Sequence, residues 1–150
     1  MNLADLLSGD AVLVDLKAAD KAKALAALSR RAADRCGLEA SQVLAALIAR
    51  ETLGSTGFGG GVAVPHARIG GLRQPIAAFA RLARPIDFQA VDDRPVDLIF
   101  LLLTPEGDEK GHLAALAQIS RLLREAARAA RLRNARSAEE LHAALTWQAG

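Results

Sequence analysis

The sequence predicts a single domain built of helices and strands together, an α/β fold. The chain has 150 residues, a length that suits one domain with a sizeable core, and 51% of them are apolar. Residues 96–103 form a nearly continuous apolar run, which is typical of a central strand covered on both faces. Farther along, one histidine and three apolar residues recur at the four-, three- and four-residue spacing of one helix face: His112, Leu116, Ile119 and Leu123.

The first third of the chain is predicted to be mainly helical. Its expected elements are a short helix at 3–7, a short strand at 11–16, and helices at about 20–35 and 40–53. Asp20 is a suitable N-cap for the second of these helices and Gly37 its stop, while Gly54 ends the third. The inward stripe of the third helix is expected to be Val43, Leu44, Leu47 and Ile48.

The rest of the chain alternates between the two kinds of element. The expected elements are strands at 62–64, 76–82 and 96–103, a short extended piece at 86–91, a helix at about 109–125, and a last helix after Ser137. Ser137 and Glu140 have the spacing of a capping box for that last helix. Four arginines are expected to lie on one solvated outer face, since no aromatic residues interleave with them: Arg121, Arg124, Arg128 and Arg131.

Composition excludes several classes of protein. The net charge of +2 gives no strong drive toward nucleic acid, and no run of eighteen apolar residues predicts insertion into a membrane. Residues 1–5 lack the pattern of a signal peptide. The single Cys36 cannot form an internal disulfide, which fits a reducing cytoplasm, and we expect it to be a buried structural thiol.

The most informative stretch is glycine-rich and leads into a histidine. Five glycines between residues 54 and 61 imply unusual backbone angles or a close approach by another group. Pro65 lacks an N–H and therefore suits a strand end, and it biases Val64 toward an extended conformation. His66 is thus expected at the rim of a sheet beside a flexible loop, either as a functional group or simply hydrogen-bonded to the backbone.

The glycine stretch does not match the known nucleotide cradles. No lysine follows the glycines as in a P-loop, and the loop runs from helix to strand rather than from strand to helix.

Two other residues can each be interpreted in two ways. Arg50 falls on the inward line of Val43, so it either snorkels at the helix end or faces an anion beside the loop. His112 either fills the core or lies near His66 at an anion-favouring helix N-terminus.

Residues 50–66 carry a long motif. They match R-E-x-x-G-S-T-G-x-G-x-G-[IV]-A-[IV]-P-H, and His112 opens an H-L-x-x-L pattern. This motif resembles the active-site segment of enzyme IIA of the phosphoenolpyruvate-dependent phosphotransferase system, of the fructose/mannitol and nitrogen-regulatory types. The resemblance implies one enzyme IIA type-2 domain over residues 1–150, a mixed sheet of about five strands flanked by helices.

The resemblance also implies a function and a set of site residues. His66 would accept a phosphoryl group from a histidine phosphocarrier protein of the HPr or NPr type, supported by Arg50 and His112. Ser55, Thr56 and the amide of Gly57 would donate hydrogen bonds to the phosphoryl oxygens. No cofactor, ATP or metal is expected. The partner-binding rim is expected to be apolar and partly exposed, formed by Phe58, Val62 and Ile69.

Two other segments favour the nitrogen-regulatory branch. Residues 84–88 and 95–98 look like that branch in particular, which implies regulatory targets such as potassium transporters or sensor kinases. Gly60 and the pair Ala67-Arg68 depart from the usual Asn and Gly-Lys, which leaves the acceptor in place and bears on the choice of donor and target. The alternatives are a sugar-specific enzyme IIA that passes phosphate to a IIB domain and a binding module without phosphate turnover.

Overall fold

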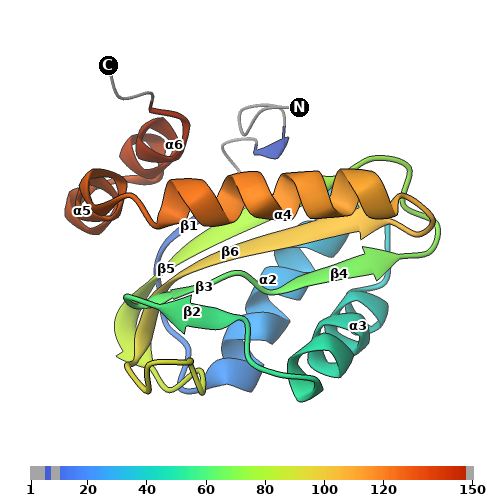
Figure 1. The fold of residues 1–150 in the computed structure, drawn as a ribbon, viewed down its shortest axis with the longest axis horizontal. Coiled ribbons are helices and arrows are strands. Elements are labelled where there is room, and N and C mark those ends of the chain that lie inside the picture. The colour runs from blue at the N-terminus through green and yellow to red at the C-terminus, as the bar shows by residue number, and fades with distance from the viewer. Residues whose placement is uncertain (1–5, 8–10, 148–150) are drawn as a thin grey trace.

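The fold is a mixed sheet of six strands with helices on both sides, seen in Figure 1 for the described residues, 6–7 and 11–147, of the computed structural model. The strands are β1 (Val12–Leu16), β2 (Gly57–Gly59), β3 (Val62–Ala63), β4 (His66–Ile69), β5 (Ile76–Ile86) and β6 (Val96–Pro105). The helices are α2 (Lys21–Cys36), α3 (Ala40–Thr52), α4 (Glu109–Leu123), α5 (Ala126–Asn134) and α6 (Ala138–Thr146). The predicted α/β fold is confirmed, with one strand more than the five expected.

The central strand is β6, as its apolar run predicted. It pairs antiparallel with β5 on one side and parallel with β3 and then β4 on the other. The outer strands are β1, parallel to β5, and β2, antiparallel to β3. Residues 98–103 are fully buried because α4 lies along one face of the sheet and α2 and α3 along the other (Figure 1).

The first two described helices begin and end close to the predicted residues. The Asp20 carboxylate accepts a hydrogen bond from the Lys23 amide at 2.9 Å, and Gly37 ends α2 in the left-handed conformation with φ of 69°. In α3 the buried stripe is narrower than expected. Val43 and Leu47 are buried, but Ile48 is 42% exposed, so its assignment to the core was wrong. The helix packs against α2 and the short strand β4, and Ile48 lies outside the face that these two elements cover.

The sequence misplaced two strand boundaries. The strand expected at 76–82 is β5, which continues through Pro85 to Ile86, and of the extended piece expected at 86–91 only Ile86 belongs to a strand. Proline is tolerated there because its pairing with β6 is irregular between Arg81 and Ile86, so no ladder hydrogen bond is lost. Residues 66–69 had no assignment and form β4, which pairs in parallel with residues 102–105.

The glycine-rich stretch is a short hairpin rather than a flexible loop. β2 and β3 pair across the turn at residues 60–61. Gly61 has φ of 80°, and a Cβ there would lie 2.6 Å from Arg133 Nη2. At Gly57 a Cβ would lie 2.8 Å from the Cβ of Ala90. A side chain could not be accommodated at these two glycines, as the predicted unusual backbone angles and close approaches imply.

The arginines after residue 120 do not share one solvated face. A break after α4 starts the separate helix α5, and it turns Arg128 inward, where only 2% of the residue is exposed. Its guanidinium donates to the carbonyls of Ala144 at 2.7 Å and Leu145 at 3.1 Å, and lies 3.1 Å from the Glu125 carboxylate. Arg128 therefore ties α5 to the last turn of α6.

We predict that Arg128→Ala lowers the free energy of unfolding by about 3 kcal/mol, because it removes a buried charge-assisted contact to two helix carbonyls. Urea titration followed by circular dichroism measures the change. The control is Arg121→Ala, on an exposed side chain of α4, which should change stability by less than about 0.5 kcal/mol. Equal stabilities for the two variants would contradict this role of Arg128.

Other predictions concern the ends of the helices and of the chain. The capping box expected at α6 is formed in part: Ser137 Oγ accepts from the Glu140 amide at 3.1 Å, but the Glu140 carboxylate accepts from the Arg136 amide at 2.7 Å and not from that of Ser137. Cys36 is half-buried, not fully buried, and its thiol lies 3.1 Å from the Ala32 carbonyl. Most of the helix expected at 3–7 lies outside the described residues. In the part of the chain that the structure describes, no helix is both long enough and apolar enough to cross a membrane.

Candidate active site

His66 lies at the start of β4, directly beside the central strand. The carbonyl of Pro65 accepts a hydrogen bond from the Leu102 amide at 3.0 Å, which fixes the backbone of the residue before His66. The imidazole Nδ1 lies 2.8 Å from the Val64 carbonyl oxygen. Since a carbonyl can only accept, Nδ1 carries the proton in the neutral ring, and Nε2 keeps its lone pair. The backbone bond expected of a strand-end histidine thus also selects the nitrogen that is free to react.

Arg50 lies at the last turn of α3 and contacts that free nitrogen. Its Nε is 3.3 Å from His66 Nε2, and its Nη1 donates to the Gly54 carbonyl at 2.8 Å. Of the two readings of Arg50, the structure therefore favours the one in which it faces the site. The second bond holds the guanidinium over the start of the hairpin.

His112 comes from the first turn of α4 and faces the same place. The centroids of the His66 and His112 rings are 5.4 Å apart, and only 3% of His112 is exposed. Its Nδ1 lies 2.6 Å from the Thr104 hydroxyl, which orients the ring, and Asp108 caps the helix through the Gly111 amide. The positive end of the α4 dipole therefore adds to a site that suits an anion.

Both imidazoles are neutral near pH 7. Burial lowers the pKa of His66, the hydrogen bond to Val64 partly opposes this, and the charge of Arg50 lowers it further. Burial also lowers the pKa of His112, and the charge of Arg68 acts in the same direction. A neutral His66 offers a lone pair for nucleophilic attack over the physiological pH range.

The hydrogen-bond donors predicted for phosphate in the hairpin are largely engaged elsewhere. The Ser55 hydroxyl donates to the Phe88 carbonyl at 2.8 Å and accepts from the Gly57 amide at 3.1 Å. The Thr56 amide donates to the Glu51 carboxylate at 3.1 Å. Of this group, the buried Thr56 hydroxyl has no protein partner. The Ser55 hydroxyl and both amides thus hold the hairpin in shape, and their donation to a phosphoryl group stays a prediction.

The predicted apolar rim differs from the structure more strongly. Val62 and Ile69 are each only 2% exposed, because they belong to strands that pair with β6 under the helices. Phe58 is half-buried, with the Arg124 guanidinium 4.8 Å from the centre of its ring. Arg124 follows His112 by twelve residues, which is about 18 Å along α4. The expected exposure was therefore wrong for Val62 and Ile69, whereas Phe58 is partly exposed but lies toward the end of α4 that is far from His112.

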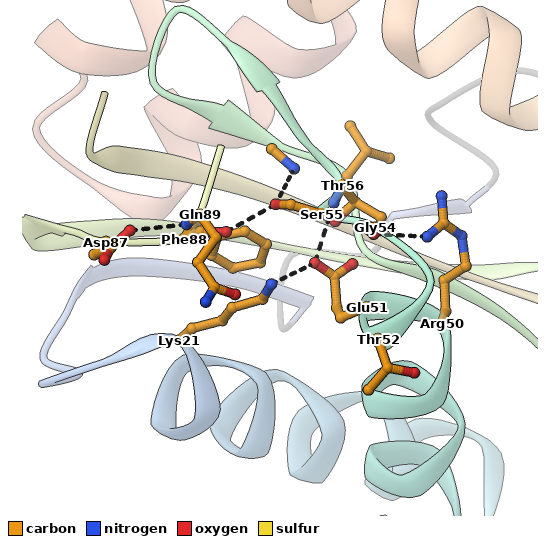
Figure 2. A network of polar contacts seen from close by, with 12 residues as sticks. Lys21, Arg50, Glu51, Thr52, Gly54, Ser55, Thr56, Asp87, Phe88 and Gln89 are labelled. Atoms are coloured by element: carbon orange, nitrogen blue, oxygen red, sulfur yellow. Dashed lines mark hydrogen bonds and ion pairs between the residues drawn. The ribbon is translucent and has the colours of Figure 1, made fainter. Parts of the chain in front are cut away.

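Sequence reasoning also missed residues that support the site. Glu51 was noted only as a letter of the motif, yet its carboxylate is buried and bridges Lys21 Nζ at 2.9 Å and the Thr56 amide, as Figure 2 shows. Lys21 carries no recognisable signal because Glu51 lies far along the chain, and Thr104 carries none because its contact with His112 spans the turn between β6 and α4. The sequence signal that could have pointed to these contacts of Glu51 is a charged residue next to Arg50 within a long motif.

The comparison with known proteins gives the family. Residues 5–147 match the model of the family described as "Phosphoenolpyruvate-dependent sugar phosphotransferase system, EIIA 2". The chain belongs to this family. It is 45% identical over 145 residues to a protein named nitrogen regulatory protein from Bradyrhizobium diazoefficiens, covering 97% of this chain and 95% of that protein.

Solved structures agree with this assignment. The crystal structure of nitrogen regulatory protein IIA-Ntr from Neisseria meningitidis superposes with a TM-score of 0.91 at 35% identity, covering 96% of this chain and 99% of that one. The mannitol IIA of Escherichia coli has a TM-score of 0.76 at 21% identity, over 93% and 98% of the two chains, and so shares the fold. The predicted nitrogen-regulatory branch and the mannitol-type fold are thereby confirmed.

Proposed function

We propose that this protein carries a phosphoryl group on Nε2 of His66, taken from a histidine phosphocarrier protein, and regulates target proteins by its phosphorylation state. The observation that carries the proposal is the hydrogen bond from Nδ1 to the Val64 carbonyl, which leaves the Nε2 lone pair facing Arg50 and His112. Membership of the enzyme IIA family and the name of the relatives support the nitrogen-regulatory role.

The transfer needs no proton to leave the acceptor. The Nε2 lone pair attacks the phosphorus of the donor's phosphohistidine, a new N–P bond forms, and the donor's N–P bond breaks. The bonding electron pair returns to the donor imidazole. The His66 ring becomes cationic while Nδ1 keeps its proton, and the Val64 carbonyl stabilises that charge through the existing hydrogen bond.

Arg50 and His112 act on the transferred group. Arg50 Nε lies at Nε2 in the unphosphorylated protein, so a small side-chain movement brings the guanidinium onto the incoming phosphoryl oxygens. Thr104 Oγ1 lies 2.6 Å from Nδ1 of His112, and in the tautomer in which this hydroxyl donates, the Nε2–H of His112 would be the donor to the same oxygens. Such donors are placed before the reaction and stabilise the charge spread over the phosphoryl group.

Regulation would follow from charge. The phosphoryl oxygens carry about two negative charges at the half-buried His66, and the cationic ring offsets only part of them. A target such as a potassium transporter or a sensor kinase distinguishes the two forms if it places an apolar or acidic group over that position, because the uncompensated charge is costly to desolvate.

The proposal is tested by titrating a purified domain of a target protein against the phosphorylated and the unphosphorylated forms of this protein. The protein is phosphorylated with phosphoenolpyruvate, the general upstream enzyme and the phosphocarrier, and binding is measured by calorimetry. We expect one acid-labile phosphate per chain and affinities that differ by about 5- to 150-fold between the forms. The control is the wild type incubated without phosphoenolpyruvate. Equal affinities would contradict regulation, and absence of labelling would contradict the carrier role.

A further inference from the structure

We propose that Glu51 is a positioning residue that fixes the orientation and the tautomer of His66 through a chain of polar contacts beginning at Lys21. The inference rests on the proposed function, in which Nε2 of His66 is the phosphoryl acceptor, and adds a residue that acts on it without touching it. The chain of contacts consists of the Glu51 carboxylate and the backbone of Thr56 and Val64, which link it to the imidazole.

The contacts are continuous from one end to the other. Lys21 Nζ lies 2.9 Å from Glu51 Oε1, and the same oxygen accepts from the Thr56 amide at 3.1 Å. The Thr56 carbonyl accepts from the Val64 amide at 3.1 Å. The Val64 carbonyl accepts from His66 Nδ1 at 2.8 Å. Thr56 and Val64 are each held at both their N–H and their C=O, so displacement of the carboxylate moves the carbonyl that orients the ring.

Burial keeps water from replacing these contacts. The side chains of Lys21 and Glu51 are 17% and 6% exposed, and Thr56 and Val64 are buried as well. Lys21 also lies 4.6 Å from the centre of the Phe88 ring, which limits its freedom. A displaced Thr56 amide has no solvent at hand to take the place of the carboxylate, so the hairpin would shift with it.

Burying the Glu51 carboxylate costs free energy. Its second oxygen, Oε2, is buried with no protein partner, and a buried ion pair is often less stable than apolar residues of similar size. A residue selected only for packing would not be charged. The charge is explained if the carboxylate is needed as an acceptor that holds the Thr56 amide in one position.

The consecutive residues Arg50 and Glu51 thereby control the two nitrogens of one ring. Adjacent positions of a helix point about 100° apart, so the last turn of α3 sends one side chain to His66 and the other into the hairpin. Arg50 contacts Nε2 directly, and Glu51 acts on Nδ1 through Thr56 and Val64. Figure 2 shows these two side chains diverging from the end of the helix.

The test measures the tautomer of His66 by ¹⁵N chemical shifts of its ring in the unphosphorylated protein, together with the rate of phosphoryl transfer. Glu51→Ala should change the spectrum from one dominant Nδ1–H form to a mixture and slow transfer about tenfold. Glu51→Gln keeps an acceptor oxygen for the Thr56 amide and should restore the dominant form and most of the rate. Glu39→Ala is the control, because that exposed side chain at the other end of α3 makes no capping bond.

The outcomes separate positioning from stability. If Glu51→Ala alone does not fold, adding Lys21→Met removes the orphaned charge, and the same spectrum is recorded on the double variant. An unchanged His66 tautomer in a folded Glu51→Ala or double variant overturns the proposal, whatever the rate of transfer. The tautomer is read without phosphate, so a wild type that cannot be phosphorylated would refute the proposed function and leave this measurement intact.

Discussion

Replacing His66 by alanine should abolish phosphorylation of this protein by phosphoenolpyruvate and its upstream enzymes. Among the described residues, His66 is the histidine whose unprotonated nitrogen lies next to the Arg50 guanidinium. The loss of phosphorylation should therefore be complete and not partial. The ring is half-buried at the end of a strand, and its removal leaves the β4 pairing with residues 102–105 in place. The variant should therefore remain folded. Intact mass spectrometry after incubation measures the phosphate bound per chain.

The matched control is His142→Ala, which removes a half-buried histidine of α6 whose Nε2 lies 3.2 Å from the Leu7 carbonyl. That variant should be labelled as fully as the wild type. Normal labelling of His66→Ala with acid-labile phosphate would move the acceptor to another residue and refute the mechanism proposed above. Circular dichroism spectra of both variants exclude unfolding as the cause of any loss.

Removing Arg50 or His112 should slow phosphoryl transfer by roughly tenfold to a hundredfold without changing the modified residue. Each side chain supplies a hydrogen bond to the charged group, and such bonds contribute about 1.5–3 kcal/mol. Arg50→Ala removes the contact at Nε2, and His112→Ala removes the ring 5.4 Å away. Rapid-quench kinetics with the phosphorylated donor measure the rate for each variant.

Two comparisons keep this prediction specific. Arg73→Ala removes an exposed arginine from the loop after β4 and should transfer at the wild-type rate. Melting temperatures are measured in parallel, because the Thr104 hydroxyl loses its buried partner in His112→Ala. Unchanged rates in stably folded Arg50→Ala and His112→Ala would leave both residues with a packing role alone.

The sequence predicted the parts of the fold that depend on local patterns. The run at 96–103 marked the central strand, and the Asp20 cap and Gly37 stop marked the limits of α2. The family resemblance grouped Arg50 and His66 of the long motif with His112 of the separate H-L-x-x-L pattern, and in the structure both Arg50 and His112 lie beside His66. These features are local in sequence or are carried by one long motif.

What the sequence missed depends on long-range packing. Val62 and Ile69 stand next to the motif and were expected to be exposed, but pairing with β6 buries them. Arg128 follows a run of helical arginines, and only the break before α5 and the docking of α6 turn it inward. Lys21 contacts Glu51 across thirty residues, and such a pair leaves no periodic signal in either segment.

The pairing of β3 and β4 with one strand has a consequence for how partners associate. Because both short strands hydrogen-bond to β6 on either side of Pro65, the backbone around the acceptor is fixed before any partner arrives. We therefore expect a partner that docks at His66 to order little further backbone of this protein. If His66 takes up a phosphoryl group as proposed, we expect a brief encounter over a small contact area to be sufficient, so that the complex dissociates quickly.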